Sequence, residues 1–313
     1  MEQVETNSIK AWLLASRPKT LAAAVTPVVV GCALATHLNS FKAVPAIICL
    51  LFAVLMQTAA NLINDLIDYK KGTDGEERLG PMRATAQGWI TPSAMKKGIA
   101  AVVATACLIG LSILFFTDRH WELIGTGLAC VVFAYLYTSG PYPLSYNGWG
   151  DVAVVIFFGI VPVCMTCLVQ ANECPLYGVA LSVGVGLAIN SLLVVNNYRD
   201  RDTDAATGKR TIIVKFGEPF GRRFYLLNGE VAALIGFLVI LYVHTQFSDY
   251  YVLRYDIYSK VKAMFVLPYL ILHIKTWKKL CEIREGKALN VLIGQSSRNM
   301  LVYALTTSLG ILL

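Results

Sequence analysis

The chain has 313 residues, of which 56% are hydrophobic and only 15% are charged, and its mean hydropathy is +0.58. A composition this apolar excludes an ordinary soluble domain and predicts a protein that crosses the membrane several times. The net charge of +7 fits the topology of such a protein together with an anionic ligand, and no pattern indicates nucleic-acid binding.

Apolar stretches follow one another along almost the whole chain. A helix needs roughly 17 to 25 such residues to cross a bilayer, and nine stretches approach or reach this length. They are 20–38, 43–64, 97–117, 121–138, 152–171, 176–197, 226–244, 262–276 and 295–313. We therefore expect a single all-α membrane domain over residues 1–313, with about nine transmembrane helices.

Basic residues are distributed unequally between the two sides that nine spans define. The N-terminal segment and the loops after even-numbered stretches carry most of the 27 lysines and arginines. Because positively charged loops are retained in the cytoplasm, this bias places the N-terminus and those loops on the cytoplasmic side.

Polar residues interrupt the apolar pattern where the second stretch ends, in the segment NLINDLID at 61–68. Asn61, Asn64 or Asp65, and Asp68 recur at intervals of three and four residues. On a helix, side chains at these intervals share one face. The pattern predicts a patch of oxygen ligands at this end of the helix.

A second polar segment, NNYRDRDTDAATGKRT at 196–211, follows the sixth stretch. Asn197, Asp200 and Asp204 lie at i, i+3 and i+7, so a helix would place them on one face, with Asp202 pointing elsewhere. The segment has the same character as the first one, since a basic, glycine-containing loop follows each.

The spacing from Asp65 to Asp200 is within one residue of the spacing from Asp68 to Asp204. This agreement predicts a weak internal repeat of a four-helix unit. Such a repeat would bring both acidic faces to one end of one cavity. The alternative is that each segment is a solvated loop at a span end, and the matched positions favour the site.

Carboxylates gathered in this way repel one another and need cations. Mg²⁺ typically takes one or two carboxylates, keeps water and fills its shell with substrate phosphate. Nearby arginines and lysines would complete a diphosphate site, because their charge matches phosphate oxygens. The candidates for diphosphate binding are Lys19, Arg78, Arg83, Lys209 and Arg210.

These segments resemble the aspartate-rich motifs of the UbiA superfamily of intramembrane aromatic prenyltransferases, and within it the branch that acts on 1,4-dihydroxy-2-naphthoate. The resemblance is carried by SRPKTL at 16–21, NLINDLID at 61–68, DGEERLGPMR at 74–83, YTSGPYPLSYNGWGD at 137–151 and NNYRDRDTDAATGKRTIIVKFG at 196–217. The chain departs from the superfamily pattern at Gly72, where a third aspartate is usual, and its next aspartate is Asp74.

The resemblance implies a UbiA-type fold, with the helices arranged around a central cavity in the cytoplasmic (inner) membrane of a bacterium. It also implies an Mg²⁺-dependent enzyme of menaquinone synthesis. Such an enzyme transfers a polyprenyl chain from polyprenyl diphosphate to 1,4-dihydroxy-2-naphthoate, with loss of carbon dioxide, to give demethylmenaquinol.

The resemblance also implies roles for individual residues. The expected metal ligands are Asn61, Asn64, Asp65, Asp68, Asn197, Asp200 and Asp204, and the four aspartates at 65, 68, 200 and 204 are the expected catalytic residues. The candidates for binding the acceptor or stabilising a carbocation are Tyr137, Tyr142, Tyr146 and Asp151.

Two other functions fit parts of the sequence. A 4-hydroxybenzoate or homogentisate prenyltransferase would have the same fold, but the run from Gly72 to Arg83 favours naphthoate. A secondary transporter would carry its acids in the middle of spans, whereas here they lie at span ends beside arginines.

Overall fold

A computed structural model of the chain describes residues 4–72, 78–245 and 252–313, with side chains from 257 onward in the last range. Asp74, the aspartate that follows Gly72, lies outside the described residues. All regular secondary structure in the described ranges is helical, so the predicted all-α fold class is confirmed.

The helices follow one another with short connections. The first half contains α1 (Ile9–Ser16), α2 (Pro18–His37), α3 (Ala43–Lys71), α4 (Pro92–Ser112), η1 (Ile113–Phe116), α5 (His120–Leu136), η2 (Leu144–Tyr146), α6 (Gly150–Val154), η3 (Val155–Ile160) and α7 (Val161–Ala171). The second half contains α8 (Leu176–Arg199), α9 (Arg201–Ala206), α10 (Ile212–Thr245), α11 (Val252–Ala263), η4 (Met264–Val266), α12 (Leu267–Ile283), η5 (Lys287–Leu289) and α13 (Asn290–Leu312).

Seven helical segments in the described part of the chain are long and apolar enough to cross a membrane. They are Pro18–His37, Ala43–Lys71, Pro92–Phe116, Gly150–Ala171, Leu176–Arg199, Ile212–Thr245 and Ile257–Ile283. Helix α5 is apolar but has 17 residues, and α13 is not among the seven. Each of the nine predicted stretches coincides with a helix, but the number of nine transmembrane helices is not confirmed.

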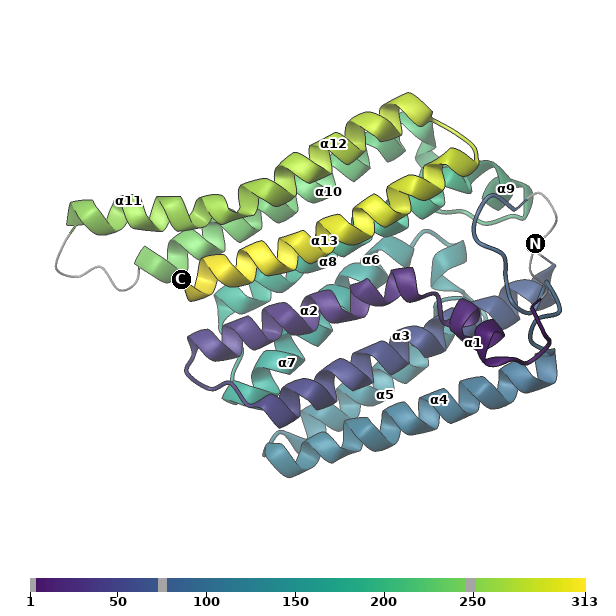
Figure 1. Cartoon of the computed structure of the whole chain (residues 1–313), viewed down its shortest axis with the longest axis horizontal. Helices are drawn as coiled ribbons and strands as arrows, with labels where there is room; N and C mark the ends of the chain where they lie inside the picture. The colour runs from purple at the N-terminus through teal and green to yellow at the C-terminus, as the bar shows by residue number, and fades with distance from the viewer. Residues whose placement is uncertain (1–3, 73–77, 246–251) are drawn as a thin grey trace.

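The long helices run side by side in one bundle (Figure 1). Helix α8 packs against α10, α13 and the α6–α7 segment, and α2 packs against α13, α7 and α3. Of the 18 most apolar consecutive residues in α8, 72% are buried, against 11% in the segment formed by α4 and η1. Helix α8 therefore belongs to the interior of the bundle and α4 to its periphery.

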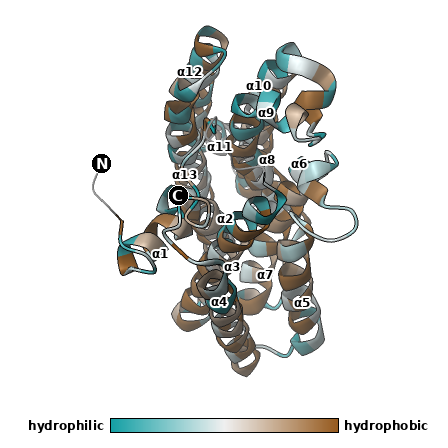
Figure 2. Cartoon of the chain, turned by 90° about the vertical axis from the view of Figure 1, so that its right-hand side faces the viewer, coloured by the Kyte–Doolittle hydropathy of each residue, from teal (hydrophilic) through white to brown (hydrophobic). Residues whose placement is uncertain are grey.

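The short helices α1 and α9 lie at one end of the bundle, on the right in Figure 1. Figure 2 looks onto this end and shows hydrophilic segments around α9 and α10, whereas α4 and α5 are mainly hydrophobic. We call this end the polar end. Both acidic segments of the sequence reach it, at the ends of α3 and α8.

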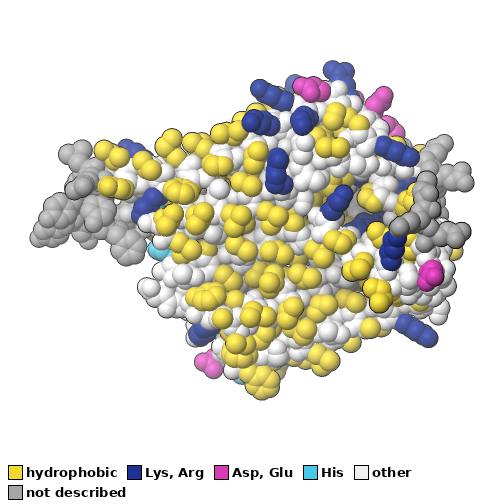
Figure 3. Space-filling model, in the orientation of Figure 1, with side chains coloured by type: hydrophobic (Ala, Val, Ile, Leu, Met, Phe, Trp, Pro, Cys, Tyr) yellow, Lys and Arg dark blue, Asp and Glu magenta, His cyan; other side chains and the backbone are white. Residues whose placement is uncertain are grey.

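Large hydrophobic side chains cover much of the outer surface. Phe115 is 89% exposed, Leu108 71% and Leu128 64%. In Figure 3 hydrophobic side chains cover the middle and lower part of the face, and most Lys and Arg lie in its upper part and toward the right. An apolar surface of this extent is stable in contact with lipid rather than water. The chain is an integral membrane protein.

Helix α3 ends at Gly72, where the sequence departs from the superfamily pattern. Gly72 has φ 67° and donates its backbone N–H to the carbonyls of Asp68 and Tyr69. This left-handed conformation favours glycine and stops the helix. The helix therefore ends one turn after Asp68, at the position where the superfamily pattern has a third aspartate.

Candidate active site

Asp68 lies at the polar end of α3 and is 8% exposed. Its Oδ2 accepts a hydrogen bond from Nη2 of Arg83 at 2.5 Å, and its Oδ1 accepts one from the Tyr146 hydroxyl at 3.3 Å. Arg83 comes from the loop between α3 and α4, and Tyr146 from η2. The structure therefore joins three segments that the sequence analysis had selected separately.

Asp65 lies one helical turn before Asp68 and is only 1% exposed. Its two carboxylate oxygens accept backbone N–H groups, Oδ2 from Ala84 at 2.8 Å and Oδ1 from Thr85 at 2.9 Å. This carboxylate is directed at the backbone of the α3–α4 loop.

The two asparagines of the first motif also have partners. Asn64 Oδ1 accepts a hydrogen bond from the Thr138 hydroxyl after α5. Asn61 Nδ2 donates to the Ser16 carbonyl at 2.8 Å and to the Thr20 hydroxyl at 3.1 Å. These contacts connect α3 to the α1–α2 junction and to the loop after α5.

Two lysines lie against the ring of Tyr146. Lys71 Nζ is 3.8 Å from the ring centroid and donates to the Thr138 carbonyl at 2.9 Å. Lys209 Nζ, from the loop after α9, is 5.4 Å from the same centroid. An aromatic face attracts cations. The Tyr146 ring therefore brings together a lysine that follows each acidic motif, next to Asp68.

The second motif begins with a forked ion pair. Arg199 donates from Nε to Asp200 Oδ1 at 2.7 Å and from Nη2 to Oδ2 at 2.6 Å. Its Nη1 donates to Asn290 Oδ1 at 2.8 Å, and Asn290 Nδ2 donates to the Leu79 carbonyl at 2.8 Å. Arg199 thus ties Asp200 to α13 and to the α3–α4 loop.

Asp204 is 8% exposed and accepts a hydrogen bond on Oδ1 from Lys209 Nζ at 3.2 Å. Burial raises the pKa of Asp204 above its usual range, although the Lys209 ammonium acts in the opposite direction. Asp202 is 82% exposed and pairs only loosely with Arg201, at 3.8 Å. As predicted, Asp202 points away from the other aspartates.

Tyr137 lies close to carboxylates from several helices. The carboxylates of Asp151, Asp204 and Asp68 lie within electrostatic reach of its hydroxyl. A Cβ built on Gly150 would lie 3.3 Å from the Tyr137 hydroxyl. Asp151, the next residue, is 7% exposed, and its Oδ1 has no hydrogen-bond partner among the described residues.

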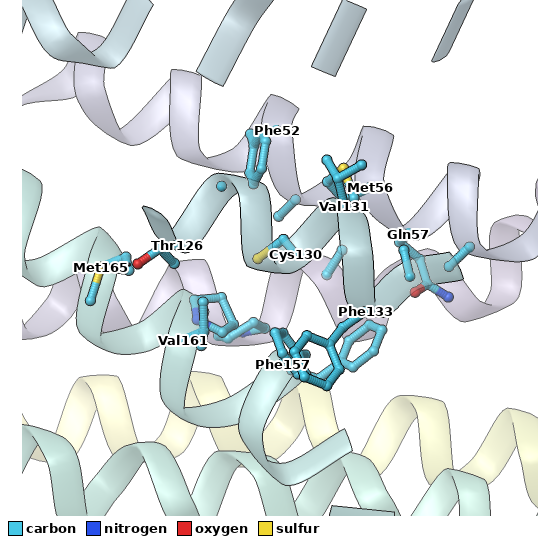
Figure 4. Close-up of a pocket in the computed structure, with 18 of the residues that line it drawn as sticks. Phe52, Met56, Gln57, Thr126, Cys130, Val131, Phe133, Phe157, Val161 and Met165 are labelled. Atoms are coloured by element: carbon cyan, nitrogen blue, oxygen red, sulfur yellow. Dashed lines mark hydrogen bonds between the residues drawn. The ribbon is translucent and has the colours of Figure 1, made fainter. Parts of the chain in front are cut away.

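A cavity of about 520 Å³ extends from Asn61, Asn64 and Tyr137 into the bundle. Its polar end is lined by Arg17, Asn61, Asn64, Tyr137 and Asn196. The remaining lining is mainly apolar. Figure 4 shows part of it, with Phe52, Met56, Cys130, Phe133 and Phe157 around the cavity and Thr126 and Met165 farther along it. Such a lining suits a long hydrocarbon chain attached to a charged head.

Some predicted site residues are exposed or do not line the cavity. Lys19, Arg210 and Tyr142 are exposed, and Asn197 is not among the described residues that line the cavity. Arg78, in the α3–α4 loop, lies within electrostatic reach of Asp68.

Sequence reasoning missed three residues that the structure places in or beside the site. Arg17 and Asn196 line the cavity, and Arg199 holds Asp200. Arg17 and Asn196 lie inside the quoted motifs, within two residues of Lys19 and Asn197, which were selected instead. The available signal for Arg199 was a single arginine directly before Asp200 in a strongly apolar helix.

The residues present fit a hard cation bound together with phosphate. No group of three or more His, Cys, Asp or Glu side chains in the described ranges could hold a metal by itself. Mg²⁺ needs only one or two carboxylates when phosphate and water fill its shell. Asp204 Oδ2 is buried without a hydrogen-bond partner among the described residues, so one carboxylate oxygen remains available for such an ion.

Comparison with known proteins agrees with this arrangement. The sequence model of the UbiA prenyltransferase family matches residues 24–274. The chain belongs to the UbiA prenyltransferase family. The 1,4-dihydroxy-2-naphthoate octaprenyltransferase of Escherichia coli is 34% identical over 253 residues, which are 79% of this chain and 80% of that protein. The enzyme of the same name from Mycobacterium tuberculosis is 36% identical over 234 residues, 75% and 79% of the two chains.

Solved structures of this family share the fold. A UbiA homolog from Archaeoglobus fulgidus, solved with DMAPP and Mg²⁺, has a TM-score of 0.65 to this chain. The match covers 96% of this chain and 98% of that one at 13% sequence identity. The predicted UbiA-type fold is therefore confirmed.

Proposed function

We propose that this chain transfers a polyprenyl chain from polyprenyl diphosphate to 1,4-dihydroxy-2-naphthoate in menaquinone synthesis. The observation that supports it most is an apolar cavity whose polar end is lined by Asn64 and Tyr137. Asn64 lies one helical turn before Asp68, which contacts Arg83 and Tyr146. The naphthoate substrate is supported by the names of the relatives from E. coli and M. tuberculosis.

The donor would lie with its hydrocarbon chain in the cavity and its diphosphate against the basic side chains of the polar end. Arg83 and Lys209 already lie beside carboxylates from the two motifs. Their charge would stabilise the negative charge that grows as the bond between the prenyl carbon and the diphosphate oxygen breaks. Arg78, Lys19 and Arg210 would add positive charge at the entrance.

We expect the metal to be Mg²⁺, held by Asn64 and Asp68 on α3 and by Asp200 and Asp204 after α8. When bound there, Mg²⁺ would supply Lewis-acid stabilisation of the diphosphate oxygens. Asn61 and Asn197 remain candidate ligands from the motifs.

The acceptor attacks the prenyl carbon with the ring carbon that carries its carboxylate. A carbon–carbon bond forms, the diphosphate leaves, and the carboxylate is released as carbon dioxide to give demethylmenaquinol. The carboxylate of Asp151 would accept the proton of an acceptor hydroxyl and return it once carbon dioxide has left, and the Tyr137 hydroxyl would orient that hydroxyl. The Tyr146 ring would stabilise positive charge. The apolar cavity excludes water, which would otherwise capture the prenyl carbocation.

The direct test uses membranes that contain the protein, Mg²⁺, a polyprenyl diphosphate and either 1,4-dihydroxy-2-naphthoate or 4-hydroxybenzoate. We expect prenylated, decarboxylated naphthoate from the wild type, and about 100-fold less or lower still from Asp68→Asn and Asp200→Asn. Asp202→Asn is the matched control, because this side chain is 82% exposed. Product only from hydroxybenzoate would reassign the substrate, and solute flux into vesicles without any product would indicate a transporter.

The proposed location in a bacterial membrane rests on the bacterial relatives. We place the chain in the cytoplasmic (inner) membrane of a bacterium, with the N-terminus and the polar end in the cytoplasm, since lysines and arginines gather in those loops. Trypsin should cleave after the exposed Arg210 in inverted membrane vesicles and not in right-side-out vesicles. The reverse pattern would contradict this orientation.

A further inference from the structure

Asp65 makes a different kind of contact from Asp68. The two residues lie one turn apart on the same face of α3. Asp68 meets side chains, those of Arg83 and Tyr146, whereas both oxygens of Asp65 meet backbone N–H groups, those of Ala84 and Thr85.

These N–H groups belong to a compact turn in the α3–α4 loop. Within it, Gln87 N–H donates to the Arg83 carbonyl at 3.0 Å, and Trp89 N–H donates to the Ala84 carbonyl at 2.9 Å. The two N–H groups bound by Asp65 thus lie at the beginning of the turn. A carboxylate suits this position, because it offers several acceptor sites and carries negative charge.

The turn is also packed against α3. Ala84 and Ile90 are buried in one apolar cluster with Leu62 and Leu66 of that helix. Apolar packing is not directional, so it holds the turn on the helix without setting its position along the helix. The two bonds to Asp65 are directional, and they join the start of the turn to α3, whereas its later residues Gly88 and Trp89 bind the N-terminal segment.

Arg83 immediately precedes the two anchored residues. Its guanidinium reaches Asp68 on the helix turn that follows Asp65. Any sliding of the turn along α3 would move this guanidinium with respect to Asp68.

We propose that Asp65 is a positioning residue, whose carboxylate holds the backbone of Ala84 and Thr85 so that Arg83 lies beside Asp68. This role rests on the proposed function, in which Arg83 faces the diphosphate. It replaces the metal-ligand role that the sequence motif suggests for Asp65. Asp65 then contributes to the reaction by positioning Arg83, and not by binding the metal.

The first test measures how strongly Asp65 binds the backbone of Ala84 and Thr85, and it needs no substrate. Hydrogen exchange of peptides within 79–90 is compared between the wild type, Asp65→Asn and Asp68→Asn. Asparagine keeps one acceptor oxygen and presents an NH₂ group to the other N–H, so we expect exchange at Ala84 and Thr85 to become about tenfold faster or more in Asp65→Asn. We expect Asp68→Asn to leave these two amides protected. Equal protection in the wild type and Asp65→Asn would overturn the proposal.

The second test separates positioning from metal binding. In Asp65→Asn we expect the KM for the polyprenyl diphosphate to rise about tenfold while the Mg²⁺ concentration for half-maximal activity stays at the wild-type value. Asp68→Asn should raise that Mg²⁺ concentration. If Asp65→Asn raises it as much as Asp68→Asn does, Asp65 is a metal ligand and the proposal fails.

A double substitution tests whether Asp65 acts through Arg83. Adding Asp65→Asn to Arg83→Ala should cost little beyond Arg83→Ala alone, because the group that is positioned is already absent. Full additivity would contradict the proposal. If Asp65→Asn does not accumulate in membranes, Asp65→Glu, which keeps both acceptor oxygens, should restore part of the protection, and its failure to do so would count against the role.

These outcomes separate the two claims. If the wild type shows no prenyl transfer, the proposed function fails. The exchange rates at Ala84 and Thr85 still decide whether Asp65 holds the turn.

Discussion

Arg199 and Asp200, neighbours in the sequence, form a forked ion pair with Nε–Oδ1 and Nη2–Oδ2 distances of 2.7 and 2.6 Å. The Arg199 side chain is 2% exposed and that of Asp200 is 23% exposed. The buried guanidinium therefore fixes both carboxylate oxygens of Asp200, and Asn290 holds its third nitrogen.

We predict that Arg199→Lys lowers kcat/KM about tenfold, since lysine keeps the charge but cannot form the fork. Arg199→Ala should lower activity further and destabilise the protein by about 3 kcal/mol, because it removes one partner of a buried pair. Prenyl transfer and thermal unfolding in detergent measure the two effects. Arg223→Lys, at an exposed arginine of α10, is the control, and equal losses in both lysine variants would contradict the role of the fork.

We predict that Gly80→Ala reduces activity through Arg199. A Cβ on Gly80 would lie 2.7 Å from Arg199 Nη2, and this nitrogen is held by Asp200. The guanidinium must shift, so we expect about a tenfold loss of kcat/KM with little change in stability. Gly125→Ala is the control, because its Cβ would meet no atom within 4 Å and Gly125 does not line the cavity. Wild-type activity in Gly80→Ala would show that the site tolerates displacement of Arg199.

We predict that Cys130→Trp changes the length of prenyl chain that the protein accepts. Cys130 lines the apolar part of the cavity (Figure 4), and a tryptophan there would occupy space that a long chain needs. The ratio of kcat/KM for long over short polyprenyl diphosphates should fall about tenfold or more. Leu108→Trp, at a side chain that is 71% exposed, should leave the ratio unchanged. An unchanged ratio in Cys130→Trp would mean that the donor chain lies elsewhere.

We predict that removing divalent cations abolishes activity and that Mg²⁺ restores it. Asp204→Asn should require more Mg²⁺ for half-maximal activity, because the buried Oδ2 without a partner would become an amide nitrogen or lose its charge. Titration of Mg²⁺ after treatment with a chelator measures this. Full activity without divalent cations would argue against the metal site.

Much of the fold could be predicted from the sequence, because the bilayer imposes helices of a certain length and apolarity. The predicted stretches coincide with helices in the structure, and both acidic motifs reach the same end of the bundle. The number of spans is not confirmed, and the ends of the helices were less predictable. Helix α10 extends to Ile212, well before the predicted stretch at 226–244, and contains Gly217 with φ 83° at a kink.

The sequence by itself was enough to predict that both acidic motifs lie at helix ends, since apolar length and helical spacing are local properties of the chain. The roles of neighbouring residues within it were not. The cavity is lined by Asn196 rather than Asn197, and Asp65 binds the backbone of the α3–α4 loop, whereas Asp68 binds Arg83. These choices depend on contacts between distant segments, such as Asn290 with Leu79, 211 residues apart. Only the tertiary structure decides them, because the direction of a side chain matters only relative to what is packed against it.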